Sequence, residues 1–237
     1  MPLQVSNLCK NITPSATLRL NALANEKRRQ GQDVISLAAG EPDFQTPFHI
    51  RQAGKEAIEQ GKTVYTATAG IPDLRQAIAK KYRDKGVDYQ NNQVIVGTGA
   101  KQVLMEALCA LLESGDEVLL PTPCWLSYPE MIAMAGAKAI PVHTSLAQGY
   151  VPSRESLESA VTKRTRAIII NNPSNPTGMV WNKAVLEMVT KLAQQYDFAI
   201  ISDEIYETFC YDGCQSTIVA GLSSDAFERT ITVSGFS

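Results

Sequence analysis

The chain has 237 residues, of which 44% are hydrophobic and 19% charged, and its formal net charge is −2. This composition is typical of a globular protein, and the near-neutral charge excludes a general attraction to nucleic acid or to an anionic membrane. The sequence shows no apolar run near the roughly 20 residues that a membrane-spanning helix requires, and its start lacks the pattern of a secretion signal. We therefore expect a cytoplasmic protein with small-molecule partners, and neither nucleic acid nor membrane among them.

Cysteine and histidine spacing gives no support for a disulfide framework or a metal site. The five cysteines are scattered, only Cys210 and Cys214 lie close together, and His49 and His143 stand alone. This spacing favours reduced thiols, with Cys109 buried on a helix, and predicts no metal.

The first part of the chain differs from the remainder. Residues 15–30 have a helical composition with a basic end, and residues 37–43 form a loop interrupted by Gly40 and Pro42. We interpret residues 1–43 as an N-terminal arm plus part of a smaller domain, and residues 44–237 as a larger domain.

Short apolar segments alternate with segments of helical period along the larger domain. The predicted strands are residues 94–98, 117–120, 139–142, 167–171, 198–203 and 230–234. The predicted helices are residues 101–112, 125–135, 153–160 and 183–196. This alternation is typical of an α/β fold, a mostly parallel sheet with helices on both faces. Because residues 167–170 show no polar alternation, we expect them in a central strand that is covered on both sides.

Polar or glycine-containing segments follow the ends of five predicted strands. In open α/β sheets, ligands bind beyond the carboxyl ends of the strands. We therefore expect one site built from five segments: Thr98 to Ala100, Pro121 to Trp125, Asn171 to Asn175, Asp203 and Ser234.

The segment from Gly97 to Gln102 lies between a predicted strand and a predicted helix. Its free N–H groups and the helix dipole could hold a phosphate, although a plain tight turn fits equally well. Nucleotide motifs are not supported, because Gln102 stands where a dinucleotide fingerprint has its third glycine and no Gly-Lys-Ser/Thr sequence exists.

The ordered motifs of the whole chain resemble those of pyridoxal phosphate (PLP)-dependent aminotransferases of class I, specifically the prokaryotic branch of the aspartate aminotransferase family. The motifs are Pro14 to Thr17, Gly40 to Asp43, Tyr65, Gly70 to Arg75, Trp125 to Pro129, Asn175 to Gly178 and Asp203 to Tyr206. The resemblance implies the large domain of PLP fold type I and a homodimer.

PLP is the cofactor that the resemblance implies. Asp203 would hold the pyridine nitrogen protonated, so that the ring acts as an electron sink. Tyr206 and Asn175 would contact the ring oxygen, and Trp125 would stack on the ring. The alternatives are a structural ion pair or helix cap for Asp203, a simple turn at Asn175, and ordinary packing for the two aromatic side chains.

The resemblance also implies a phosphate site and a substrate site. Gly99, Ala100 and Ser234 would bind the phosphate with Lys101 beside them, and Tyr65 would reach the phosphate bound in the other subunit.

The substrate α-carboxylate would contact Gly40, close to Trp125 and Asn175. Lys101, helped by Thr17, would recognise the distal carboxylate of aspartate or glutamate, since a cation in a closed site selects strongly for an anion. The alternative for Lys101 is a solvated helix residue.

We therefore expect the complete protein to convert aspartate and 2-oxoglutarate into oxaloacetate and glutamate by a ping-pong mechanism. Alternatives of the same fold are an aminotransferase for aromatic or other amino acids and a PLP-dependent C–S lyase. Alternatives that are not enzymes are an effector module of a regulator and an inactive fragment.

Two family residues are absent from the chain. The resemblance places the Schiff-base lysine immediately after Ser237 and the arginine that clamps the α-carboxylate further on. We therefore expect the protein to continue beyond Ser237 with a lysine, the larger domain being truncated here, and we expect that the 237 residues alone do not transaminate.

Overall fold

The computed structural model describes residues 3–236 apart from residues 11, 13–15, 38, 39 and 41. The chain divides into two units, Met1–Thr68 and Ala69–Ser237. The domain boundary that the sequence suggested after residue 43 stays a prediction.

The first unit is helical. It contains α1 (Asn7–Lys10), α2 (Ala16–Arg29) and α3 (Phe48–Glu59). Helix α2 corresponds to the helix expected at residues 15–30, and its basic last turn complements the negative end of the helix dipole. Large apolar side chains of this unit are exposed, including Leu23 on α2 and Phe48 and Ile58 on α3.

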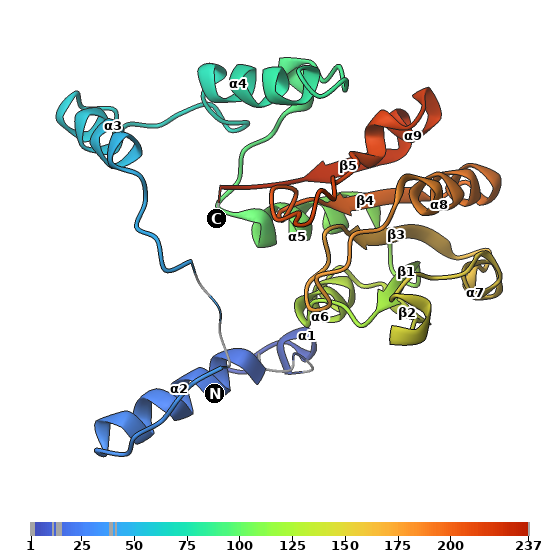
Figure 1. Ribbon diagram of the computed structural model, residues 1–237, viewed down its shortest axis with the longest axis horizontal. Helices are drawn as coiled ribbons and strands as arrows, with labels where there is room; N and C mark the ends of the chain where they lie inside the picture. Colours follow the sequence, from blue (N-terminus) through green and yellow to red (C-terminus); the bar gives the residue numbers. More distant parts are fainter. Residues whose placement is uncertain (1–2, 11, 13–15, 38–39, 41, 237) are drawn as a thin grey trace. The chain divides into compact units, whose positions relative to one another are not determined.

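A parallel five-stranded sheet forms the centre of the second unit (Figure 1). Its strands are β1 (Glu117–Thr122), β2 (Lys138–His143), β3 (Thr165–Asn171), β4 (Ala199–Asp203) and β5 (Thr230–Val233). Their order is β2-β1-β3-β4-β5, and every neighbouring pair is parallel. The apolar strand β3 lies in the middle, as its lack of polar alternation predicted.

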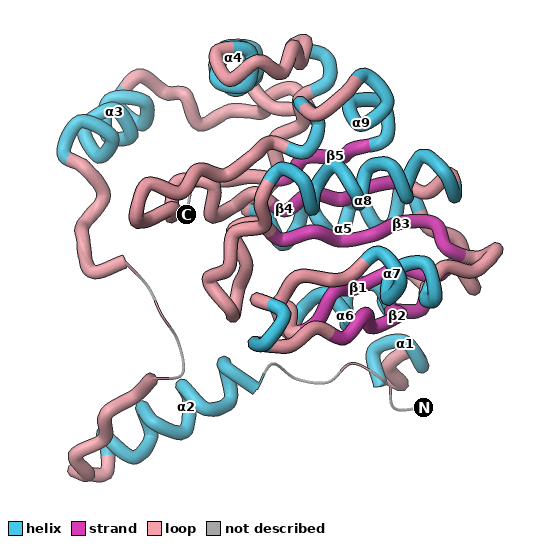
Figure 2. The backbone as a smooth tube through the Cα atoms, turned by 45° about the vertical axis from the view of Figure 1, so that its right-hand side comes forward, coloured by secondary structure: helices cyan, strands magenta, loops and turns pink. Residues whose placement is uncertain are grey.

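Helices cover both faces of the sheet (Figure 2). On one face lie α5 (Ala100–Leu111) and α6 (Ser127–Met134), and on the other α7 (Arg154–Ala160) and α8 (Lys183–Tyr196). The second unit also contains α4 (Pro72–Arg83), α9 (Ser224–Arg229) and the 3-10 turns η1 (Asn91–Gln93), η2 (Leu146–Gln148) and η3 (Val219–Gly221). Among the described residues, no helix combines the length and apolarity needed to cross a membrane.

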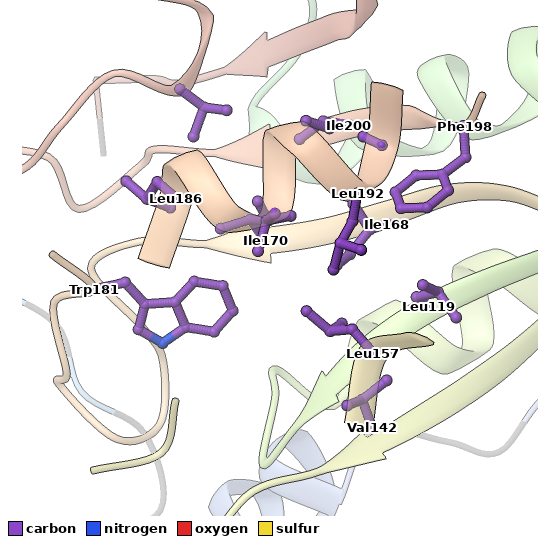
Figure 3. Close-up of a cluster of buried hydrophobic side chains, with 13 residues drawn as sticks. Leu119, Val142, Leu157, Ile168, Ile170, Trp181, Leu186, Leu192, Phe198 and Ile200 are labelled. Carbon is purple, nitrogen blue, oxygen red and sulfur yellow. The ribbon is translucent and has the colours of Figure 1, made fainter. Parts of the chain in front are cut away.

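Side chains that alternate along each strand enter two separate hydrophobic clusters. Figure 3 shows the first, in which Ile168 and Ile170 of β3 and Ile200 of β4 face α7 and α8. The next residues along the same strands, Ile169 and Ile201, belong to the second cluster with α5 and α6. Both faces of the sheet are therefore buried, which explains the continuous apolar runs in the strands.

Two expectations about local structure are wrong. Residues 94–98 are not a strand: Val96 N donates to Ala69 O at 3.1 Å, and Arg75 Nε donates to Val94 O at 2.9 Å, so these backbone groups are bound outside the sheet. Cys109 is exposed, because it follows the buried Leu108 on α5 and the helical turn directs it away from the sheet.

Candidate functional site

The strands end together at the carboxyl edge of the sheet because they are parallel and in register. Asn171 at the end of β3 pairs with Asp203 at the end of β4, and Asp203 pairs with Val233 at the end of β5. Polar residues that follow these strands are thereby placed side by side.

Asp203 is the buried acid of this edge, with only 3% of its surface exposed. The Tyr128 hydroxyl donates to Oδ2 at 2.5 Å, and Ile205 N donates to Oδ1 at 3.2 Å. Burial raises the pKa of Asp203, while these two hydrogen bonds oppose the rise. In the part of the chain that the structure describes, no cation lies within ion-pair distance of Asp203.

Two asparagines hold the loop after β3 against the end of β4. Asn171 Nδ2 donates to Asp203 O at 3.1 Å, and Asn171 Oδ1 accepts from Asn175 N at 2.7 Å. Asn172 is 1% exposed and its Oδ1 accepts from Trp181 N at 2.7 Å. These bonds give Asn171 and Asn172 a structural role and fix where Asn175 lies.

Trp125 connects α5 with the buried acid. Lys101 Nζ lies 4.9 Å from the centroid of the Trp125 ring, a cation–π contact. The same ring meets Tyr128 edge-on, with centroids 5.3 Å apart and planes at 86°. Contacts thus run from Lys101 through Trp125 and Tyr128 to Asp203.

A glycine turn precedes α5. Gly99 has φ +88°, a left-handed value that favours glycine, and it caps α5 without a side-chain hydrogen bond. Within the turn, Thr98 N donates to Gln102 Oε1 at 2.7 Å and Gly99 N donates to Gly97 O at 2.9 Å. The amides that remain for an anion are those of Ala100 and Lys101, at the positive end of α5. Gly99, Ala100 and Ser234 line one cavity of about 410 Å³.

Two further acids, Glu204 and Glu207, lie in the turn after β4, and no role for either was predicted from the sequence. Glu204 is 1% exposed, its Oε1 accepts from Ser202 Oγ at 2.9 Å and from Val219 N at 3.2 Å, and burial raises its pKa to about 7.

Glu207 pairs with two lysines of the α4 region. It binds Lys81, and its Oε2 accepts from Lys85 Nζ at 2.6 Å. Burial opposes its ionisation, but hydrogen bonds from both lysines outweigh burial and lower its pKa. Ser234 Oγ donates to Glu207 Oε1 at 3.5 Å.

The remaining predicted residues fall into two groups. Tyr206 lies in the turn after β4, and its ring centroid is 6.0 Å from that of Phe209. Thr17, Gly40 and Tyr65 belong to the first unit, where Tyr65 is fully exposed. Pro14, Ser15, Glu41 and Ser237, which are parts of the quoted motifs or of the chain end, lie outside the described residues. The roles assigned to all predicted site residues stay predictions.

Tyr128 was missed, although the sequence contained a signal for it. It follows Trp125 by three residues, a spacing that puts both side chains on one side of a helical turn.

These features define an α/β protein with a candidate ligand site at the carboxyl edge of a parallel sheet, close to a buried acid. Residues 32–237 match the family model described as aminotransferase class I and II. The chain belongs to this family.

Similar proteins include the aspartate aminotransferase of Bacillus sp. (strain YM-2), 44% identical over 98% of this chain and 60% of that protein. The aspartate/prephenate aminotransferase of Thermus thermophilus is 44% identical over 98% of the chain and 59% of that protein. A solved structure of Thermus thermophilus aspartate aminotransferase with maleate superposes with a TM-score of 0.94, at 44% identity over 98% of this chain and 60% of that one. The predicted fold class is confirmed, and the chain spans about 60% of the length of these relatives.

Proposed function

We propose that this chain forms the cofactor-binding part of a PLP-dependent aspartate aminotransferase. The observation that supports it best is Asp203, a buried carboxylate at the end of β4 with two hydrogen-bond donors and no cationic partner among the described residues. A buried carboxylate is costly unless a cation or several donors compensate it. Family membership implies PLP, whose protonated pyridine nitrogen supplies such a cation.

The residues present fit this cofactor on chemical grounds. Asp203 would hold the pyridine nitrogen, and Trp125 would offer the face of its ring. The Gly99 turn and the first amides of α5, with Ser234 on the same cavity, would hold the phosphate. Tyr206 and Asn175 would donate to the ring oxygen. When bound, PLP supplies an electron sink for the carbanion that deprotonation of an amino acid generates.

The chain's own residues then have distinct tasks. Asp203, held as a carboxylate by its two hydrogen-bond donors, would keep a proton on the ring nitrogen by charge pairing. Trp125 would cover one face of the ring and keep water from it. Lys101 supplies a positive charge at the start of α5, where a second carboxylate of the substrate would be bound.

The choice of aspartate rests on Lys101 and on the relatives. Lys101 is the cation placed on Trp125, and the curated relatives at 39–44% identity are named aspartate or aspartate/prephenate aminotransferase. We include in the proposal 2-oxoglutarate as acceptor, a cytoplasmic location and a homodimer in which Tyr65 reaches the partner's phosphate.

The test is amino transfer to 2-oxoglutarate by the complete protein, which continues beyond Ser237, loaded with PLP. Aspartate, phenylalanine and cystathionine are compared as donors, and prephenate as an alternative acceptor. We expect aspartate to have the highest kcat/KM. Equal or faster turnover of phenylalanine, or cleavage of cystathionine, would contradict the role of Lys101.

Asp203→Ala tests the role of the buried acid, with Asp84→Asn as a control because Asp84 forms only an exposed pair with Lys80. We expect Asp203→Ala to lose at least about 100-fold in kcat, the order of magnitude that a single electrostatic group in an active site contributes. Asp84→Asn should keep full activity. Retention of most activity in Asp203→Ala would disprove the proposed role.

A further inference from the structure

Tyr128 makes the shortest contact to Asp203. Its side chain is 1% exposed, and its hydroxyl donates to Asp203 Oδ2 at 2.5 Å. Neutral O–H···O bonds centre on about 2.7–2.8 Å, whereas charge-assisted bonds to an oxyanion are about 2.5–2.7 Å. Tyr128 is therefore a direct donor to the buried carboxylate, and a hydrogen bond of this kind favours the ionised form of Asp203.

Tyr128 is rigidly held. It is the second residue of α6 and belongs to the buried cluster with Met131 and Ile132. Trp125 contacts its ring edge-on. Burial, and then the charge of Asp203, raise the pKa of the Tyr128 hydroxyl well above its ordinary value, so it remains a proton donor throughout the range in which proteins are stable.

We infer that Tyr128 is the positioning residue of the site, a fixed donor that orients the Asp203 carboxylate and keeps it ionised for a cationic ring nitrogen. This inference rests on the proposed function for the identity of that cation. It extends the proposal to a side chain that lies behind Asp203 and need not touch cofactor or substrate.

The geometry explains why one donor would have this effect. An ionised carboxylate has about four lone-pair positions, and here Tyr128 holds one on Oδ2 while Ile205 N holds one on Oδ1. The two bonds fix the plane of the carboxylate and leave positions for a further partner. Without Tyr128, only a 3.2 Å backbone bond would oppose the effect of burial, which favours the protonated form.

The experiment compares Tyr128→Phe with wild type in the PLP-loaded protein, and with Tyr89→Phe in a titration without cofactor. Tyr89 is a matched control, because it is a partly buried tyrosine whose hydroxyl bonds to Thr232 Oγ1 at 2.9 Å. A hydrogen bond to a charged group corresponds to a change of about 10- to 100-fold in an equilibrium. We expect Tyr128→Phe to weaken PLP binding by about this factor and to lower kcat with little change in KM. Tyr89 lines the cavity of Gly99 and Ser234, so Tyr89→Phe serves as a control for the Asp203 titration alone.

A second readout needs no cofactor. The carboxyl carbons of ¹³C-labelled aspartate are titrated in wild-type protein and in both variants. We expect the Asp203 titration to move to higher pH in Tyr128→Phe alone. The inference is refuted by an unchanged Asp203 titration in a folded Tyr128→Phe protein, or by equal changes in Tyr89→Phe.

A double-mutant cycle with Tyr128→Phe and Asp203→Asn distinguishes a general loss of folding from a loss of the contact that positions the Asp203 carboxylate. A positioning role predicts that Tyr128→Phe has little effect on PLP affinity once Asp203 is an amide, whereas additive losses refute it. The proposed function has a separate test. If it is wrong, Asp203→Ala retains activity, and this result does not depend on the effect of Tyr128→Phe.

Discussion

Replacing Glu204 with glutamine should change how the stability of the protein depends on pH. Glu204 is 1% exposed, and its Oε1 accepts hydrogen bonds from Ser202 and Val219. Glutamine has nearly the same shape and keeps an oxygen for both bonds, so Glu204→Gln removes the ionisation and little else. The neighbouring acid Asp203 is unchanged in this variant.

The magnitude follows from the pKa of Glu204, which burial raises from 4.5 to about 7. Because the folded state binds this proton more tightly than the unfolded state, the stabilisation is complete below pH 4.5 and is lost as the pH rises through 7. One pKa unit corresponds to about 1.4 kcal/mol, so the wild-type protein should lose about 3 kcal/mol across this interval through Glu204 alone.

The assay is urea unfolding of wild type and Glu204→Gln at several pH values between 4.5 and 8. Other titrating groups are common to both proteins and cancel in the difference. We expect the difference in unfolding free energy to move by about 3 kcal/mol in favour of the variant as the pH rises. A difference that stays constant over this range would refute the argument that burial holds the proton on Glu204.

Three further substitutions test the packing around the sheet and the site. Leu186→Ala on α8, at a fully buried position, should destabilise the protein by about 2–5 kcal/mol in urea unfolding, and a loss below 1 kcal/mol would contradict the described core. Glu207→Gln should lower the unfolding free energy by about 1–2 kcal/mol and speed proteolysis near α4, because it weakens the pairing with two lysines. The exposed control Asp84→Asn should change the unfolding free energy by less than about 0.5 kcal/mol, and equal losses would argue against a special role for Glu207. Gly70→Ala should lower the stability by at least about 1 kcal/mol in thermal unfolding, since φ of Gly70 is +99° and the new methyl group would lie 2.8 Å from Val96 Cβ. An unchanged melting temperature would contradict this backbone geometry at Gly70.

Much of the second unit was predictable because its signals are local. The helix at Lys183–Tyr196 was predicted with its observed bounds, since Asn182 caps its start and an apolar stripe runs along it. Helix α4 was missed although Pro72, Asp73 and a basic last turn are all helix signals. The segment at residues 94–98 shows the opposite error: it has strand composition, but its hydrogen bonds depend on Arg75 and Ala69, which are distant in the sequence.

The site was predictable where residues follow strand ends and unpredictable where two elements meet. Asp203 ends β4 and Asn171 ends β3, so parallel register brings them to one edge, with Asn175 bonded to Asn171 in the loop that follows. The spacing from Trp125 indicated on which side of the helix Tyr128 lies, but its bond to Asp203 joins positions 75 residues apart, and no local pattern predicts that partner. Glu207 and its lysines likewise meet across more than 120 residues.

The division of the core by the sheet has a consequence for engineering. Tyr128 belongs to the cluster of α5 and α6, and Ala100 and Trp125 pack against it. The cluster of α7 and α8 contains none of the predicted site residues among those that the structure describes. Repacking the α7–α8 layer, at positions such as Val189, therefore offers a route to a more heat-resistant protein that leaves the layer of Tyr128 and Trp125 unchanged. Similar changes in the opposite layer would alter thermal resistance and chemistry together.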